Sequence, residues 1–331
     1  MALFRYPGGK VRYTGFILPT LYRYSGFSVY VEPFVGGGSV ALAMATRHSG
    51  VELIINDLDP GIAAFWDLIA NANEPEFQSL LDRIQNTRPT VAMFNEMLES
   101  KPSDRPGRAF RTFFLNRTSF GGMGWRPLGG KNQTSAGKID SRWGGAKSVP
   151  EFDEARRLLH GRTQVLNADF TSVIPLANQK ALMFLDPQYY EAGNLLYNFK
   201  WTDDDHIRLR DALRGRSNWV MSYDDHRFIR DLYATLAYLM AVKYSVGKKR
   251  KEMNELLLFP RLEFPPEFNP NVGAGGTGDT LRIWIKGYGP NDRSVVSDRF
   301  VLNSACRVLF PPVDWRGSAK RTSKSRYDLQ Q

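Results

Sequence analysis

The sequence predicts an α/β fold in which two parts of a largely parallel sheet flank an inserted, mainly helical region. Three observations predict it. Short apolar segments that end in aspartate or in a glycine turn alternate with helix-forming segments over the first part of the chain. The same strand pattern resumes at residue 163. Residues 70–161, which lie between, lack that pattern and are rich in polar residues.

The first part of the sheet is predicted from residue 27 onward. The segment "FSVYVEPF" (27–34) is β-branched and aromatic, and it gives way through "VGGGS" to the helix-forming "VALAMATRH". A second apolar strand at 51–57 is followed by Asp59 as a helix N-cap and by Pro60 at the first helical position. Strand, helix and strand in this order imply parallel strands with a right-handed crossover.

The insertion and the second part of the sheet follow. The segment 108–147 is glycine-rich, basic and rich in aromatic residues, and it is too long to be an ordinary connection. A helix is predicted from Thr202, with Asp205 completing a pattern like a capping box. Further strands are predicted at 163–170, 180–187, 218–225, 239–246 and 255–260. The predicted division is a split α/β domain (1–69 and 162–259), an inserted domain (70–161) and a C-terminal extension (260–331).

Composition narrows the class of partner. The 331 residues carry a formal charge of +10, which favours a polyanion such as nucleic acid because neutralised phosphates release counterions. Cys306 is the only cysteine and there are four histidines, so neither a disulfide framework nor a metal site is predicted. No signal peptide and no membrane-length apolar run is evident, which favours a cytoplasmic location. Within the extension, one strand is predicted at 281–286 and a disordered basic tail after it.

The glycine motif "VEPFVGGGSVALA" predicts a strand, a tight turn and a helix N-terminus, where backbone donors face a negatively charged or zwitterionic ligand. Asp57 ends the next strand, where its carboxylate can accept hydrogen bonds from ribose hydroxyls. Together they favour a nucleoside cofactor. Gly36, Gly38 and Ala41 also satisfy a loose G-x-G-x-x-A pattern, so a nicotinamide cofactor and an oxidoreductase stay open on this evidence.

The segment "DPQYY" places Asp186 at the carboxyl end of an apolar strand, where doubly wound sheets bind ligands. If the substrate is a base with an exocyclic amine, Asp186 would accept one amine hydrogen and the Pro187 carbonyl the other. Tyr189 would stack on the ring, contributing about 1 to 3 kcal/mol against the cost of unstacking. A strand-terminal Asp-Pro also fits a simple turn.

Six motifs in order resemble the Dam-like DNA adenine N6-methyltransferases: "FRYPGGK", "VEPFVGGGSV", "INDLDP", "LNRTSFGG", "LNADF" and "LDPQYY". The resemblance covers residues 4–259. It implies a Rossmann-like sheet, S-adenosylmethionine (SAM) as cofactor, and methyl transfer to the N6 amine of an adenine flipped out of double-stranded DNA. It also implies a bacterial or phage-encoded enzyme, with the insertion recognising the target. Neither the recognition sequence nor the oligomeric state follows from it.

The resemblance implies roles for individual residues. Catalysis would rest on Asp186, Pro187 and Tyr189. The cofactor would be contacted by Tyr6, Lys10, Phe34, Gly36, Gly38, Asp57, Asp169, Phe170 and Asp186. DNA would be contacted by Arg117, Phe120, Arg126 and Lys131, with Phe120 as an aromatic wedge in the duplex. Further sequence-independent attraction to DNA would come from Lys138, Arg142 and Lys147. A solvated basic hairpin with Phe120 in a small core is the structural alternative.

Two departures from the family pattern stand out. Gln188 replaces the second proline of Asp-Pro-Pro-Tyr, which leaves the direction of the Pro187 carbonyl less fixed. Activity is expected to be retained, and Gln188→Pro is expected to raise the rate if aiming is the defect. Gly121 stands where the GATC-specific enzymes carry a base-reading side chain, so specificity cannot be transferred.

Two alternatives within the fold follow from the same residues. One is a catalytically impaired DNA-binding protein, because of Gln188. The other is an enzyme that methylates the cytosine amine, since an Asp-Pro-x-Tyr loop can hold that group equally well. Methylation at cytosine C5 is disfavoured, because it needs a thiolate and Cys306 lies beyond the resemblance.

Overall fold

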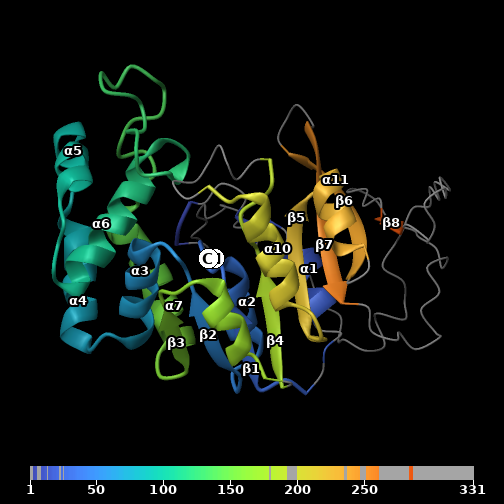
Figure 1. The fold of residues 1–331 in the computed structure, drawn as a ribbon. Coiled ribbons are helices and arrows are strands. Elements are labelled where there is room, and N and C mark those ends of the chain that lie inside the picture. The colour runs from blue at the N-terminus through green and yellow to red at the C-terminus, as the bar shows by residue number, and fades with distance from the viewer. Residues whose placement is uncertain are drawn as a thin grey trace, which may run out of the picture.

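A single eight-stranded sheet forms the centre of the protein (Figure 1). The computed structural model describes residues 3–5, 9–12, 14–21, 24, 26–178, 180–191, 200–234, 237–246, 251–260 and 283–285. The strand order is β3-β2-β1-β4-β5-β7-β6-β8. The strands are β1 (Val29–Glu32), β2 (Glu52–Asn56), β3 (Thr163–Leu166), β4 (Ala181–Leu185), β5 (Trp219–Asp224), β6 (Ala237–Val246), β7 (Lys251–Pro260) and β8 (Ile283–Ile285).

The directions of the strands confirm the predicted Rossmann-like fold. Strands β1 to β5 run parallel, whereas β7 is antiparallel to β5, and β6 is antiparallel to β7 and β8. The strand predicted at 255–260 is longer than expected, because β7 begins at Lys251 and pairs with β6 along its whole length. The predicted strand at 281–286 corresponds to β8, and the basic tail lies outside the described residues.

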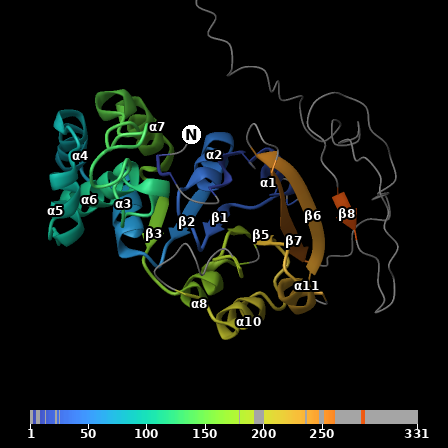
Figure 2. The ribbon, with the colours of Figure 1, turned by 90° about the horizontal axis from the view of Figure 1, so that it is seen from above.

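Helices cover both faces of the sheet (Figure 2). One face carries α1 (Thr14–Leu21) and α2 (Ser39–Arg47), and the other carries α8 (Phe170–Val173), α10 (Asp203–Ala212) and α11 (Arg227–Tyr233). Alternate side chains of β4 enter two different cores, with Leu182 and Phe184 in one and Met183 and Leu185 in the other. A strand buried on both faces reads as a continuous apolar run, which is why β4 could be located from sequence.

Local capping signals in the sequence correspond to observed helix starts. Asp59 accepts hydrogen bonds from the backbone N–H groups of Gly61 and Ile62 at the start of α3 (Pro60–Asn71). Thr202 and Asp205 form the predicted capping box at the start of α10. Such contacts satisfy backbone donors that have no partner inside the helix, so they fix where the helix begins.

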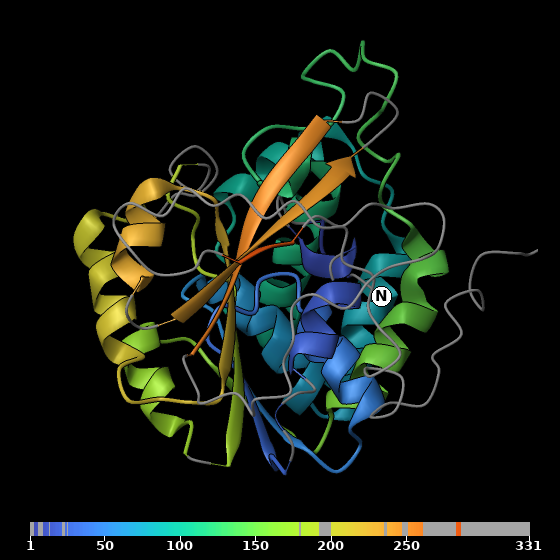
Figure 3. The ribbon, with the colours of Figure 1, turned by 90° about the vertical axis from the view of Figure 1, so that its right-hand side faces the viewer.

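The helical region between β2 and β3 packs beside the β3 edge of the sheet (Figures 1 and 2). After α3, its α-helices are α4 (Glu74–Asn86), α5 (Val91–Glu99), α6 (Arg105–Thr118) and α7 (Val149–Leu159). The ring of Phe113 on α6 packs against Phe65 of α3 and Phe152 of α7, with centroid distances of 6.0 and 5.0 Å. The connection 119–148 extends beyond the carboxyl edge of the sheet, as do the strands β6 and β7 (Figure 3).

Candidate active site

The carboxyl ends of β1 and β4 are neighbours, and the candidate site lies at this edge. Val31 of β1 pairs with Met183 of β4, so the segments that follow Glu32 and Leu185 leave the sheet side by side. The first segment is the glycine turn and the second begins with Asp186. Strand order reverses between β1 and β4, which is the point where open α/β sheets bind ligands.

The glycine turn is held by backbone contacts. The N–H of Val35 donates to the carbonyl of Asn56 at 2.8 Å, and the carbonyl of Gly36 accepts from the indole N–H of Trp66 at 2.9 Å. Gly38 precedes α2 with φ of 65°, and a Cβ there would overlap the Trp66 ring. No side chain caps α2 at Gly38, so its first backbone donors face the carboxyl edge without a side-chain acceptor at that position.

Asp57 joins the glycine turn to the end of β2. Its carboxylate accepts the N–H of Gly36 at 2.9 Å and the N–H of Asp59 at 2.9 Å. Burial raises the pKa of Asp57 from 3.8 to about 6, although both hydrogen bonds favour the ionised form. At pH 7 to 8 the group is therefore ionised and is a hydrogen-bond acceptor.

An aromatic cluster lies beside the turn. Phe170 is buried, and its ring centroid lies 5.7 Å from Phe34 and 5.4 Å from Trp201. Asp169 accepts the N–H of Thr171 at 2.9 Å and so caps α8. Phe34 and Phe170, two of the residues expected to contact the cofactor, therefore lie beside each other, and Asp169 precedes Phe170 in the chain. Trp201 was not predicted, because nothing in its local sequence indicates that it packs against the glycine turn.

Asp186 is held from two sides. The ammonium of Lys10 lies 2.9 Å from its Oδ1, and Ser222 donates its hydroxyl to the same oxygen at 2.8 Å. Lys10 is only 3% exposed, and it also lies 3.9 Å from a carboxylate oxygen of Glu255. Both partners of Asp186 use Oδ1, so among the described residues its Oδ2 is left to accept a hydrogen from a ligand.

Tyr189 completes this cluster. The ammonium of Lys10 lies over its ring, 4.8 Å from the centroid, and the Tyr223 ring stacks beside it at 6.1 Å. Burial raises the pKa of the Tyr189 hydroxyl well above its ordinary value, and the charges of Asp186 and Glu255 act in the same direction. The hydroxyl therefore stays protonated at physiological pH.

Glu32 is a second buried carboxyl group at this edge. The Tyr30 hydroxyl donates to it at 2.8 Å. Burial raises the pKa of Glu32 well above its ordinary value, and the charge of Asp186 contributes further. Glu32, Ser222 and Glu255 were missed from sequence. Glu32 and Ser222 are polar residues at or near the carboxyl end of an apolar strand, and that position is the signal that could have identified them. Glu255 lies in the middle of β7 and offers no such signal.

The predicted DNA-contacting residues lie around the segment that follows α6. Ser119 and Pro127 form a β-bridge, and the N–H of Phe120 donates to the carbonyl of Arg126 at 2.8 Å. Phe120 is 60% exposed, so the alternative in which it occupies a small core is wrong. Trp125, which was not predicted, is 49% exposed on the same hairpin. The hairpin therefore presents two aromatic rings to solvent.

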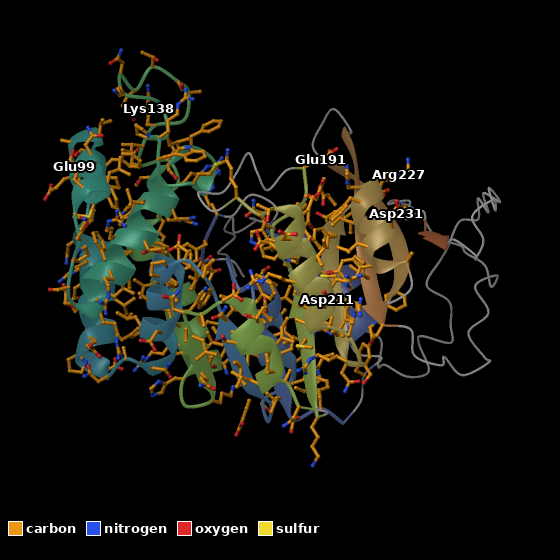
Figure 4. The ribbon with its side chains drawn as sticks, in the orientation of Figure 1. Glu99, Lys138, Glu191, Asp211, Arg227 and Asp231 are labelled. Atoms are coloured by element: carbon orange, nitrogen blue, oxygen red, sulfur yellow. The ribbon has the colours of Figure 1, made fainter. Side chains whose placement is uncertain are left out.

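The basic residues of this region differ in exposure. Arg126 is exposed, with its guanidinium 5.9 Å from the Phe120 ring. Arg117 is half-buried over the Phe113 ring, and burial, followed by the nearby charges of Arg5 and Arg142, lowers its pKa. The remaining predicted residues are exposed: Lys131, Lys138 (labelled in Figure 4), Arg142 and Lys147.

Three further predictions concern Tyr6, metal binding and membrane spans. Tyr6 lies outside the described residues. Within the part of the chain that the structure describes, no group of three or more His, Cys, Asp or Glu side chains could hold a metal ion. In the same residues, no helix combines the length and apolar character that crossing a bilayer requires.

Comparison with known proteins gives a consistent result. The family of D12 class N6 adenine-specific DNA methyltransferases matches residues 6–251. The type II methyltransferase M.MjaIII of Methanocaldococcus jannaschii is 22% identical over 232 residues, which cover 62% of this chain and 76% of that protein. The DNA N-6-adenine-methyltransferase of Escherichia phage P1 is 25% identical over 249 residues, which cover 70% of this chain but only 31% of the phage protein. The type II methyltransferase M.CviBI of Paramecium bursaria Chlorella virus NC1A is 23% identical over 215 residues, which cover 63% of this chain and 78% of that protein.

Proposed function

The chain belongs to the family of D12 class N6 adenine-specific DNA methyltransferases, and from that premise we propose how its residues carry out the reaction. It is a SAM-dependent enzyme that methylates the N6 amine of adenine in DNA. Family membership favours this activity over a nicotinamide-dependent oxidoreductase, a cytosine amino-methyltransferase and a DNA-binding protein without activity.

The residues of the glycine turn and its surroundings fit SAM. Asp57 offers an acceptor for ribose hydroxyls, and the cluster of Phe34, Phe170 and Trp201 offers apolar surface for the adenine of the cofactor. The turn at Gly36 and Gly38 leaves backbone donors for the methionine carboxylate. SAM supplies an electrophilic methyl group on a sulfonium sulfur.

Asp186 and Pro187 hold the adenine amine in this proposal. The Oδ2 of Asp186 accepts one amine hydrogen and the Pro187 carbonyl accepts the other, which directs the nitrogen lone pair toward the glycine turn. Orienting the amine in this way lowers the barrier without a covalent enzyme intermediate. The ring of Tyr189, three residues after Asp186 in the same loop, would contribute stacking on the base. The observation that supports this most directly is the placement of Asp186 beside the glycine turn, with Oδ1 occupied and Oδ2 available.

The substrate of this site would be double-stranded DNA with one base flipped out. A carboxylate at a sheet edge cannot reach an amine inside a base stack, so the adenine must leave the duplex. The exposed ring of Phe120 suits a wedge that fills the space the adenine leaves. We assign target recognition to residues 70–161 and non-specific attraction to the basic residues of the connection 119–148.

The names of the relatives support a biological setting for this activity. Two of them are named type II methyltransferases, so a role in restriction and modification is part of the proposal. The enzyme would act on DNA in the cytoplasm of a bacterium or a phage-infected cell.

The test is a methylation assay with product analysis. The purified protein is incubated with labelled SAM and unmethylated DNA, and the DNA is digested to nucleosides. Label in N6-methyladenine supports the proposal, whereas label in N4-methylcytosine, or no label, contradicts it. Asp186→Asn should lower the rate at least about a hundredfold, a larger effect than on SAM binding, because the acceptor for the amine hydrogen becomes a donor or is misaligned.

A further inference from the structure

We propose that β5 positions the catalytic loop 186–191 through Ser222 and Asp224, and that this clamp replaces the restraint that the family's second proline would supply. The inference rests on the proposed function of Asp186 and Pro187. Ser222 and Asp224 are positioning residues here, since neither needs to touch the substrate. The clamp accounts for how a chain with Gln188 can still aim the Pro187 carbonyl.

Asp224 holds the far end of the loop through its backbone. One carboxylate oxygen accepts the N–H of Tyr190 at 2.9 Å, and the other accepts the N–H of Glu191 at 2.8 Å. Hydrogen bonds to an ionised acceptor are stronger than neutral ones, and two on adjacent amides fix both position and orientation. The loop therefore cannot rotate about residues 190 and 191 without breaking both bonds.

The side chain of Tyr190 adds a second restraint at the same end. Its ring stacks on His226 with centroids 4.3 Å apart, and on Phe228 at 4.9 Å. Its hydroxyl donates to Asp203 at the start of α10 at 3.1 Å. The adjacent residue, Tyr189, stacks beside Tyr223, which lies between the two clamping residues in the sequence.

Ser222 holds the near end of the loop by donating to Oδ1 of Asp186. Ser222 and Asp224 are two residues apart, so both point to the same face of β5. The strand that carries them is rigid, because β5 pairs with β4 on one side and with β7 on the other. Residues 187–189 thus form a short segment that is held at one end by Ser222 and at the other by Asp224.

The proline of the family motif would achieve a similar result by a different route. A proline restricts the preceding residue to extended conformations and so limits where its carbonyl can point. Gln188 does not impose this restriction, so the ψ angle of Pro187, and with it the direction of the Pro187 carbonyl, is left to other contacts to fix. The clamp supplies the ordering in the folded enzyme, so the proline and the clamp should be redundant.

Redundancy can be tested with a double-mutant cycle. Four proteins are compared: wild type, Asp224→Asn, Gln188→Pro, and the double variant. Asparagine has the size of aspartate but only one acceptor oxygen, so one of the two clamping bonds is lost. Asp231→Asn is the matched control, since it removes the same charge from the exposed surface of α11 (Figure 4). Single-turnover methylation rates are measured at saturating SAM and DNA.

We expect Asp224→Asn to lower the single-turnover rate about tenfold to a hundredfold, because a small misplacement of the acceptor carbonyl costs that much. The dissociation constant for SAM should change less than about twofold, as the glycine turn is untouched. Adding Gln188→Pro to Asp224→Asn should restore most of the rate. Gln188→Pro in the wild type should change the rate less than about threefold, and Asp231→Asn should resemble the wild type.

Two results would overturn the clamp. One is an Asp224→Asn rate within about twofold of the wild type. The other is an Asp224→Asn defect that Gln188→Pro does not relieve although both proteins melt like the wild type. Should Gln188→Pro fold poorly, Tyr190→Phe and Tyr190→Ala give a second test. Phenylalanine keeps the stacking on His226 and loses only the hydrogen bond to Asp203, whereas alanine loses both, so Tyr190→Ala should lower the rate more than Tyr190→Phe.

Failure of the proposed function can be distinguished from failure of the clamp. A wild type that makes no N6-methyladenine refutes the function. The clamp is then judged by amide hydrogen exchange at residues 190 and 191, which donate to Asp224. Asp224→Asn should speed exchange there relative to Asp231→Asn, and unchanged exchange would refute the clamp.

Discussion

At the scale of single residues, the site contains ionisable groups whose behaviour depends on their surroundings. Lys10 is buried between Asp186 and Glu255, so its positive charge compensates carboxylates that would otherwise repel each other. Asp57 has no cation as a partner among the residues that the structure describes, and instead receives two backbone hydrogen bonds. Backbone donors stabilise its charge incompletely, which is why burial raises its pKa to about 6.

We predict that the affinity for SAM depends on the ionisation of Asp57. With a pKa of about 6, about a tenth of the protein holds ionised Asp57 at pH 5, so the dissociation constant should be about tenfold higher there than at pH 7.5. Isothermal titration calorimetry at the two pH values measures this. Asp57→Asn should bind weakly at both values, and a wild-type affinity that is equal at pH 5 and 7.5 contradicts the prediction.

The same group should affect stability with the opposite trend. Folded Asp57 binds its proton more tightly than the unfolded chain, whose pKa is near 3.8. Unfolding therefore releases a proton between about pH 4 and pH 6, and the contribution of Asp57 to the free energy of unfolding falls as the pH rises through this range. Urea denaturation of the SAM-free proteins measures this effect. The free energy of unfolding of the wild type, relative to that of Asp57→Asn, should be lower at pH 6.5 than at pH 4.5.

At the scale of elements, the site depends on two tight turns and on the residues that contact them. The turn at Gly38 is closed on one side by the Trp66 indole, which also donates to the Gly36 carbonyl. The hairpin after α6 is held by the bridge from Ser119 to Pro127, which leaves Phe120 in solvent. One turn thus needs a glycine for space, and the other leaves an aromatic ring exposed to solvent.

Gly38→Ala is predicted to destabilise the protein by about 3 kcal/mol or more, for two reasons. The added methyl group would overlap the Trp66 ring, and alanine disfavours the left-handed backbone conformation of residue 38. Gly26 is the matched control. It has φ of 77°, and a methyl group there would have no atom within 4 Å, so Gly26→Ala should cost only about 1 kcal/mol. Urea denaturation compares the two, and equal losses would mean that Trp66 can move aside.

Phe120→Ala is predicted to impair catalysis without loss of stability. The ring is 60% exposed, so the free energy of unfolding should change by less than about 0.5 kcal/mol. If the ring stacks in the duplex, kcat/KM for DNA should fall about 5- to 150-fold. Leu176→Ala is the control, because Leu176 is also exposed but lies just before the amino end of β4, away from the carboxyl edge. A normal kcat/KM for Phe120→Ala contradicts the wedge.

At the scale of the whole molecule, charge and sheet order set how DNA is approached. The net charge is +10, and exposed lysines and arginines occur in the connection 119–148, which extends beyond the carboxyl edge of the sheet (Figure 3). The amino edge carries the opposite ends of the strands, including Lys180 just before β4. A basic side chain should therefore matter for DNA binding according to the edge on which it lies.

This difference can be measured from the salt dependence of binding. Lys131→Gln should reduce the slope of log Kd against log salt concentration by about 0.9, the value for one phosphate contact. Lys180→Gln removes the same charge from the amino edge and should leave the slope unchanged. Fluorescence anisotropy with labelled duplex DNA provides the measurement. Equal slopes for the two variants would show that Lys131 does not contact phosphate.

The sequence determined the order of the elements and the positions of the motifs. Asp59 as a cap, the box at Thr202 and the apolar run of β4 could be predicted because each depends on residues close together in the chain. The glycine turn and Asp186 could be assigned to strand ends for the same reason. Strand lengths at the antiparallel edge were less predictable, since the extent of β7 depends on its pairing with β6.

The tertiary structure alone decided which groups surround Asp186. Lys10, Ser222 and Glu255 come from distant parts of the chain, and their meeting requires β5 beside β4 and β7 beside β5. The same sheet order places Asp224 against the catalytic loop. Local patterns indicate which residues form a strand. The pairing of buried charges depends instead on which strands become neighbours, and this is determined only when the whole sheet assembles.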